Sequence, residues 1–534
     1  MPSEDCERYK DFLPYIGEFG AFQKWLLVCM MPSAFLYSFT YFGQIFMIIV
    51  PKDYWCRIRD LETSPKDQQL ALAIPKLKTG DFDRCSMYDL KSGWAENNIS
   101  IANETWPKVP CSNGWTYDKD QLYYSTIATE NNWVCDDLVL GTFTMTSFFM
   151  GSMLGCLVLG FVADHCGRLW AFLLANTCSL VGGCCTALCN DFYSFTAARF
   201  VVGMAMNNCF IPIYILTLEN VGVKYRTLAG NLSLALAFTL GGTLLPWVAY
   251  WSNDWRLFAL VISLPVTLLL VIGIILPESP SWLFSVGKID KGVKVLQKAA
   301  RINKKTVSDE DWSELRRCYA LQYANQQSQK TISCVDLFKR FRRCCVMMVL
   351  ITFWMIIALV YDVHVRAVFL MGTDTFLTFS LSTLTELPAG IVPMFLVDRV
   401  GRKPVAMSVM ILCAFCSLLA AFLPGKWDAA IAAIFGRLFI AIGFNVGQQW
   451  ATEIIPTVVR GQGIAVINVM GCAGAMLGPY IIYTEQFYHS FPMIANTFLS
   501  IVAACLLILL PETKNEDLPQ SLEEAEKRWT LCCC

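Results

Sequence analysis

The stretches GFVADHCGR at residues 160–168 and MFLVDRVGR at residues 394–402 decide the fold, because each follows a long apolar run and a fixed offset relates them. Adding 234 to the numbers of Asp164, Gly167 and Arg168 gives Asp398, Gly401 and Arg402. The same offset relates four more identical pairs: Glu219 and Glu453, Arg226 and Arg460, Pro277 and Pro511, and Glu278 and Glu512. All of them lie at the ends of apolar runs, so we interpret the chain as a duplicated unit.

Twelve apolar runs surround these repeats, and each has the length of roughly 20 residues that crosses a bilayer. They cover residues 25–51, 138–163, 169–190, 200–218, 227–253, 257–277, 344–361, 375–397, 404–425, 429–452, 461–484 and 490–511. The composition agrees, with 55% hydrophobic and 16% charged residues and a mean hydropathy of +0.47, whereas soluble domains carry about 25% charged residues. We therefore predict an all-α membrane protein with twelve transmembrane helices in two six-helix halves.

Lysine and arginine near the helix ends indicate the orientation, since they are enriched on the cytoplasmic side. The short loops on the side of the termini hold most of them, and the polar stretch that ends at Arg343 is also basic. We expect a cytoplasmic N-terminus at 1–24, an N-terminal half at 25–276, a cytoplasmic segment at 277–343, a C-terminal half at 344–510 and a cytoplasmic tail at 511–534.

A large polar loop at 52–137 follows the first run and is therefore expected outside the cell. It contains four cysteines, Cys56, Cys85, Cys111 and Cys135, which predict two disulfides with three pairings open. Asn98 and Asn103 begin glycosylation sequons in the same loop. At the other end of the chain, Cys532–Cys534 fit either palmitoylation or free thiols.

The charge balance excludes a nucleic-acid binder, because 42 Lys+Arg face 43 Asp+Glu. The sequence contains no phosphate-binding loop, zinc-spaced ligand set or Ser/His/Asp constellation. We expect no enzyme activity, no cofactor and no metal.

Several motifs resemble those of solute carrier family 22, a group of major facilitator transporters. Residues 160–168 resemble the major facilitator loop motif, with His165 in place of a basic residue, and Pro277–Leu283 resembles the family's Pro-Glu-Ser-Pro-Arg-Trp-Leu signature, with Ser281 in place of arginine. The large loop with its cysteines and Asn132–Asp136 are also similar. The resemblance covers essentially the whole chain and implies a plasma-membrane carrier whose halves rock around a central substrate site.

The repeated charges at the cytoplasmic helix ends are candidates for a gate, because acids and arginines can pair in one conformation and separate in another. Topology alone accounts for the arginines but not for the acids. The expected gating residues are Asp164, Arg168, Glu219, Arg226, Asp398, Arg402, Glu453 and Arg460.

Intramembrane ionisable residues are the first candidates for substrate recognition. Glu386 lies midway through its span and could neutralise an ammonium group, or could instead pair with a neighbouring helix, as Arg199 and Arg437 could. Asp362 and Arg366 share a helical face, which suits either an interfacial ion pair or a vestibule site. Aromatic faces add cation–π contacts. The full set of predicted substrate-binding residues is Glu386, Tyr361, Tyr37, Tyr214, Asn207, Gln448, Asp362 and Cys472.

Cys472 departs from the pattern of the family. The resemblance implies an aspartate at this position in cation carriers and an arginine in anion or carnitine-type carriers. We therefore expect a carrier of small organic cations or zwitterions that are carnitine-like, β-alanine-like or conjugated amines. The alternatives are an organic anion carrier of the same family and a transporter-like sensor that does not cycle. Facilitated transport and transport coupled to sodium or protons both fit the sequence.

Overall fold

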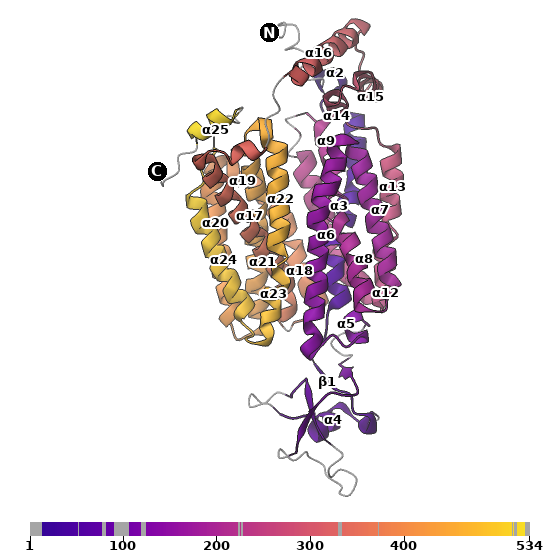
Figure 1. Cartoon of the computed structure of the whole chain (residues 1–534), viewed down its shortest axis with the longest axis vertical. Coiled ribbons are helices and arrows are strands. Elements are labelled where there is room, and N and C mark those ends of the chain that lie inside the picture. Colours follow the sequence, from indigo (N-terminus) through magenta and orange to yellow (C-terminus); the bar gives the residue numbers. More distant parts are fainter. Residues whose placement is uncertain are drawn as a thin grey trace.

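Two helical bundles stand side by side and are built from the two halves of the chain (Figure 1). The structure is a computed structural model that describes residues 13–51, 53–62, 64–76, 82–89, 106–118, 124–222, 225, 228–328, 334–371, 373–514, 516, 519 and 521–528. The two sequons, Arg226 and the C-terminal cysteines of the sequence analysis lie outside these residues.

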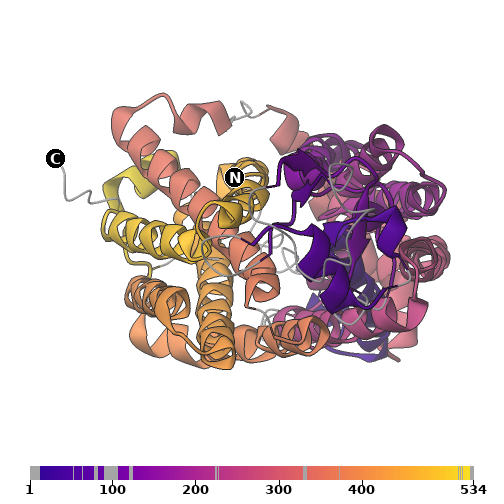
Figure 2. The same cartoon turned by 90° about the horizontal axis from the view of Figure 1, so that it is seen from below.

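The first bundle contains the helices before the polar segment. They are α3 (Ala21–Ile48), α6 (Leu138–His165), α7 (Arg168–Ala187), α8 (Phe192–Ala205), α9 (Ile211–Glu219), α11 (Ser233–Ser252), α12 (Trp255–Ser263) and α13 (Val266–Ile275). The second bundle contains α17 (Phe341–Ala367), α18 (Thr375–Leu384), α19 (Glu386–Val400), α20 (Arg402–Phe422), α21 (Lys426–Ile454), α22 (Arg460–Ala475), α23 (Gly478–Tyr483) and α24 (Phe491–Ile508). Figure 2 shows the bundles end-on, as two adjacent groups.

Eleven helices of the described chain are long and apolar enough to cross a membrane. The fourth predicted span is the exception, because residues 206–210 form turns that divide it into α8 and α9. The expected single helix at 200–218 is therefore corrected to two shorter helices that begin at Phe192 and end at Glu219. Pro212 near the start of α9 fits this break, since proline suits the first turn of a new helix.

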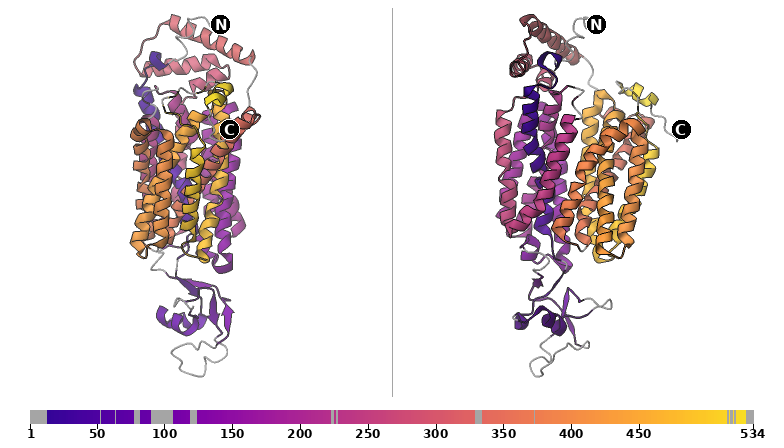
Figure 3. Two further views of the ribbon diagram at one scale, coloured as in Figure 1. Left: turned by 90° about the vertical axis from the view of Figure 1, so that its left-hand side faces the viewer. Right: turned by 180° about the vertical axis from the view of Figure 1, so that it is seen from behind.

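The described residues between 54 and 137 form a small unit at one end of the first bundle, which we call the loop end (Figure 3). Two antiparallel pairs of short strands build it: β1 (Tyr54–Cys56) with β4 (Trp115–Tyr117), and β2 (Ser86–Tyr88) with β3 (Lys108–Pro110). Helix α4 (Lys66–Ala73) packs with them around Trp55. Of the three pairings left open by the sequence, the structure has Cys56–Cys111 and Cys85–Cys135.

The opposite end, which we call the tail end, carries the short helix α2 (Leu13–Ile16), the helices α14 (Pro280–Ser285), α15 (Ile289–Ile302) and α16 (Asp309–Ser328), and the last helix, α25 (Leu522–Arg528). Arg343 at the start of α17 binds Glu526 of α25, with 3.2 Å between Nε and Oε2. Asn303, after α15, accepts a hydrogen bond from the Phe22 amide at the start of α3. The first and last described helices thus lie at the same end of the bundles.

The repeated motif forms the same turn in both halves. Gly167 and Gly401 precede α7 and α20 with φ of 116° and 114°, a region that favours glycine. The carboxylate of Glu278 accepts hydrogen bonds from the first two amides of α7, and Glu512 does the same for α20. A Cβ on either glycine would lie 2.2 Å or 2.9 Å from the capping carboxylate oxygen. The turn therefore explains why glycine and glutamate recur together at one offset.

Candidate substrate site between the halves

Toward the loop end, the two bundles pack against each other through aromatic rings. Phe46 of α3 lies 5.7 Å from Phe369 and 5.0 Å from Phe379, measured between ring centroids. Phe376 packs in the same way against Tyr250 of α11, at 5.5 Å. At the tail end, by contrast, the ribbons of the two bundles stand apart (Figures 1 and 3). The halves are therefore closed against each other on the loop side.

The predicted acid, Glu386, is the first residue of α19 and is held by two neighbouring helices. Arg437 Nη2 of α21 and the Tyr361 hydroxyl of α17 each donate a hydrogen bond of 2.7 Å to Glu386 Oε1. Arg437 Nη2 also donates to the Tyr361 oxygen at 3.1 Å. The structure thus realises the helix-pairing alternative for both Glu386 and Arg437. We call Glu386, Arg437 and Tyr361 the central triad.

Both hydrogen bonds of Glu386 end on Oε1, and no described residue donates to Oε2. The Glu386 side chain keeps 11% exposure, whereas that of Arg437 keeps 1%. A carboxylate has about four lone-pair positions, so the second oxygen retains its capacity to accept an ammonium hydrogen. The triad can bind a cation there without losing the bond between Glu386 and Arg437.

Aromatic side chains of both halves surround the triad. The Arg437 guanidinium carbon lies 4.4 Å from the centroid of the Tyr361 ring and 5.8 Å from that of Phe42 in α3. Tyr41 of α3 faces Tyr361 at 6.3 Å, and Phe444 of α21 lies 5.4 Å from Tyr361. The triad therefore lies at the contact between the halves, where a substrate that enters from either side of the membrane would contact both halves.

A second group of predicted residues meets one helical turn further along α3. The Tyr37 hydroxyl donates to Asn207 Oδ1 at 3.2 Å, and Asn207 Nδ2 lies 3.7 Å from Cys472 Sγ and 3.5 Å from Cys156 Sγ. Ser152 of α6 approaches Cys472 at 3.4 Å. Asn207 occupies the turn between α8 and α9, so the broken span brings an amide to the interface.

The remaining predicted residues lie at different distances from these groups. Tyr214 joins them through Phe210, with ring centroids 5.4 Å apart, and Phe210 stacks on Tyr37 at 5.7 Å. Asp362 follows Tyr361 and binds Arg366. Gln448 is half-buried on α21, roughly 16 Å of helix rise beyond Arg437, and takes no part in the triad.

Sequence reasoning missed several residues that the structure brings to this interface. Phe238 lies 5.4 Å from Tyr37, and Phe444, Phe42, Ser152 and Cys156 make the contacts described above. In an apolar span nothing distinguishes a ring that faces the other half from one that faces lipid. A small polar residue such as Ser152 inside a span was the one available signal.

Five of the predicted gating residues, Asp164, Arg168, Asp398, Arg402 and Glu453, form salt bridges at the tail end, and each of these bridges lies within one half. Arg168 binds Asp164 at 2.7 Å, and Arg402 binds Asp398 at 3.2 Å. Arg402 also binds Glu453 of α21 at 3.0 Å, whereas Arg460 donates to the Ile455 carbonyl at 3.4 Å. Glu219 and Glu453 accept hydrogen bonds from Ser279 and Thr513, two more residues related by the offset of 234.

Comparisons with known proteins agree with this architecture. The sequence profile of the sugar (and other) transporter family matches residues 112–529. The chain is 30% identical to the β-alanine transporter of Drosophila melanogaster, over 98% of this chain and 91% of that protein, and 28% identical to the Drosophila carcinine transporter, over 98% and 80%. It is also 30% identical to mouse solute carrier family 22 member 7, over 97% of each chain.

Among solved structures, the xylose transporter XylE of E. coli in a partially occluded inward-open conformation resembles this chain with a TM-score of 0.61 and 14% identity. The similarity covers 93% of this chain and 100% of that one. At this identity the likeness concerns the fold alone.

Proposed function

We propose that this chain, which belongs to solute carrier family 22 within the major facilitator superfamily, carries small organic cations or zwitterions across the plasma membrane by alternating access. Like the other members of this family, it is a multi-pass membrane transporter and not an enzyme. The substrate class, the location in the plasma membrane and the alternating-access cycle are the parts that we propose. β-Alanine-like, carnitine-like and conjugated amines are the substrates that it names.

The observation that carries the proposal is the central triad with its one unoccupied carboxylate oxygen. Glu386 Oε2 offers a hydrogen-bond acceptor of negative charge, and the rings of Tyr37, Tyr41 and Phe444 offer cation–π faces within the same interface. Organic cations are held by such ring faces, each contributing about 0.5–2 kcal/mol, more than by a lone charge. Because Arg437 already balances Glu386, the site also suits a substrate that carries an anionic group of its own.

The closed loop end supports an alternating-access cycle in which this conformation faces the cytoplasm. In this proposal the loop end is extracellular and the tail end cytoplasmic, as the lysine and arginine distribution favours. The helix-end salt bridges of Arg168 and Arg402 then hold each half together as a rigid body. The acids of these bridges, Asp164 and Asp398, are 72% and 76% exposed, so they can bind new partners in the other conformation.

An organic anion carrier is the second candidate, and Arg199 of α8 is the observation that favours it. Arg199 is 2% exposed, and its Nε donates only to the neutral Gln44 Oε1, at 3.3 Å. No acidic side chain of the described chain lies within salt-bridge distance of it, and its Nη2 has no hydrogen-bond partner there. A buried, uncompensated cation is costly, and an anionic substrate group would offset that cost.

An uptake screen distinguishes these candidates. Cells that express the chain are given radiolabelled β-alanine, carcinine, carnitine, tetraethylammonium and an aromatic carboxylate, each with and without sodium and a proton gradient. We expect accumulation of the amines and competition among them, with little effect of the carboxylate. Uptake of the carboxylate alone would assign the chain to anions, and binding without accumulation of any compound would indicate a sensor.

A further inference from the structure

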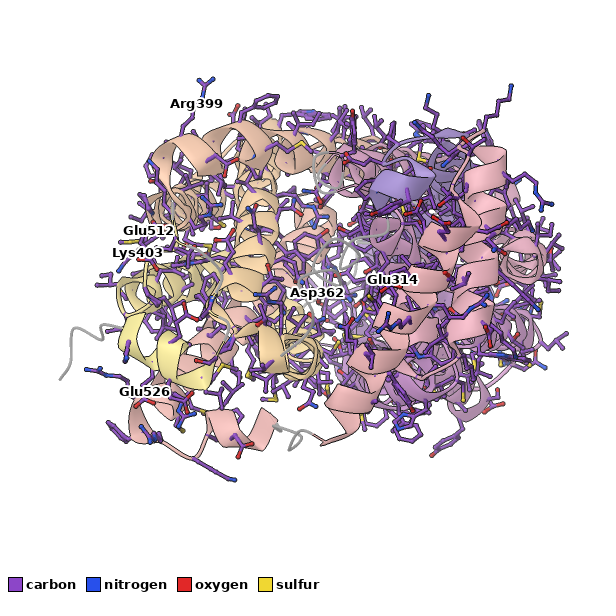
Figure 4. All side chains as sticks on the ribbon, turned by 90° about the horizontal axis from the view of Figure 1, so that it is seen from above. Glu314, Asp362, Arg399, Lys403, Glu512 and Glu526 are labelled. Carbon is purple, nitrogen blue, oxygen red and sulfur yellow. A yellow bond between two sulfur atoms is a disulfide. The ribbon has the colours of Figure 1, made fainter. Side chains whose placement is uncertain are left out.

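A second ion pair lies between the halves, nearer the loop end than the central triad. Arg366 Nε is 2.8 Å from Asp362 Oδ2, and Arg366 Nη2 is 3.0 Å from Oδ1. The Asp362 and Arg366 side chains are 1% and 9% exposed. Figure 4 shows Asp362 near the middle of the molecule, where the two bundles meet. This bidentate pair is therefore buried, unlike the exposed Asp164 and Asp398 at the tail end.

Among the described residues, the first bundle contributes only uncharged contacts to Arg366. Arg366 Nη1 contacts the Met145 sulfur, and the guanidinium carbon lies 5.9 Å from the centroid of the Phe149 ring; both residues belong to α6. On the other side of the pair, Gly478 leaves room for Asp362, because a Cβ there would lie 2.2 Å from Oδ2. A thioether and a ring face hold the guanidinium only weakly, so separation of the halves at the loop end exposes both charged groups.

Stability alone does not account for two charges at this position. Replacing a buried ion pair by apolar residues of similar volume is often neutral or stabilising, and ionisable residues inside a membrane are candidates for function. Each of the two pairs between the halves contains one acid and one arginine. Tyr361 joins them, since it precedes Asp362 in α17 and donates to Glu386.

We propose that Asp362 and Arg366 form an outer recognition site for a zwitterion, with the substrate ammonium on Asp362 and its carboxylate on Arg366. The site is occupied when the halves separate at the loop end, and the substrate then passes to the central triad, which has the same pair of charges. This inference rests on the proposed function and narrows its substrate class to compounds that carry both groups.

The matched charges explain why a zwitterion is preferred over a plain cation. A zwitterion supplies a counter-charge to each partner of the pair, so neither Asp362 nor Arg366 is left uncompensated when their mutual bonds open. A cation without an anionic group binds Asp362 only, so the hydrogen bonds that Arg366 gives up to Asp362 are not replaced by bonds to the substrate. Discrimination between the two substrates therefore resides in Arg366.

The test compares β-alanine, which has an ammonium and a carboxylate, with carcinine, which has an ammonium but no carboxylate. Uptake Vmax/KM is measured for both in cells expressing wild type, Arg366→Gln, Asp362→Asn and the double variant. We expect Arg366→Gln to lower the β-alanine-to-carcinine ratio about tenfold or more, because a hydrogen bond to a charged group is lost for β-alanine alone. Asp362→Asn should lower uptake of both substrates.

Asp374→Asn is the matched control, because Asp374 is an exposed acid of the same half at the loop end, where it caps α18; it should leave the ratio unchanged. If the single variants fail to reach the cell surface, the double variant supplies the ratio, since it removes both buried charges together. An unchanged ratio in Arg366→Gln, or in the double variant, overturns the outer site while leaving the proposed function intact. Wild type that takes up carcinine or tetraethylammonium but neither zwitterion, β-alanine or carnitine, also overturns the site, and wild type that takes up no amine of the uptake screen refutes the proposed function itself.

Discussion

The bond between Glu386 and Arg437 leads to the sharpest prediction. Replacing Glu386 by glutamine removes the acid that binds Arg437, a side chain of 1% exposure. At 2.7 Å and an effective dielectric constant near 20, the gross attraction between these charges is about 6 kcal/mol. Removing one partner of a buried pair costs about 3–5 kcal/mol, because the other charge stays buried without compensation. We expect Glu386→Gln to lower the amount of folded protein at the cell surface.

The double variant Glu386→Gln/Arg437→Gln separates this structural cost from substrate recognition. Loss of both charges leaves nothing buried and unpaired, so surface expression and the melting temperature of the purified protein should recover toward wild type. Amine uptake per surface molecule should stay low, because the carboxylate oxygen that accepts the ammonium is missing. A charge-assisted hydrogen bond is worth about 1.5–3 kcal/mol, which corresponds to a loss of roughly 10- to 150-fold in Vmax/KM.

The assay measures surface protein by biotinylation and amine uptake in the same cells. Glu386→Asp is the matched control, because it keeps the charge and shortens the side chain by one methylene. Our reasoning would be refuted by a double variant that reaches the surface normally and takes up amines at the wild-type rate. It would equally be refuted if Glu386→Gln alone were as stable as wild type.

Three further predictions follow from contacts elsewhere. Cys156 of the first half and Cys472 of the second both contact the Asn207 amide. Copper phenanthroline should therefore oxidise the two thiols to a disulfide that blocks uptake until dithiothreitol is added, and Cys472→Ser should prevent the block. Replacing Cys85 and Cys135 by serine should destabilise the loop-end unit by about 2–5 kcal/mol, seen as loss of surface protein even when transport per surface molecule is normal. Glu512→Gln should lower the melting temperature of the purified chain, since two amides of α20 lose about 1–2 kcal/mol of charged capping; an unchanged melting temperature would contradict the capping role.

The sequence predicted the architecture well, because the signals involved are strong and local. Long apolar runs indicate helices in a membrane, and the repeated glycine and glutamate pairs predicted the duplication that the two bundles display. The break between α8 and α9 was missed although the sequence carries a signal for it: Asn207 and Asn208 interrupt the apolar composition, and Pro212 follows them. Asparagine favours turns and proline favours the first turn of a helix, but Asn207 was interpreted only as a substrate-binding residue within one continuous helix.

The candidate site was predictable only in part, because its contacts join residues that are far apart in the chain. Glu386 and Arg437 were both recognised as intramembrane charges, but their spacing does not reveal that they meet. The sequence likewise left open whether Asp362 and Arg366 face a vestibule or an interface. In the structure, Arg366 contacts Met145 of the other half, so the pair lies at the interface between the halves. Which aromatic rings face the partner bundle depends on helix rotation, which an apolar span without periodicity does not specify.

The attachment of the loop-end unit has a consequence for observing the cycle. Both of its connections, to α3 and to α6, belong to the first bundle, and the Tyr124 and Thr126 hydroxyls bind the carbonyls of Phe46 and Ile49 at the end of α3. In the proposed cycle the unit therefore moves with the first bundle. A fluorophore on it, paired with another on the loop between α20 and α21, would convert a small rotation at the interface into a large change in energy transfer. A label on this unit would thus report single transport events without any modification of the substrate path.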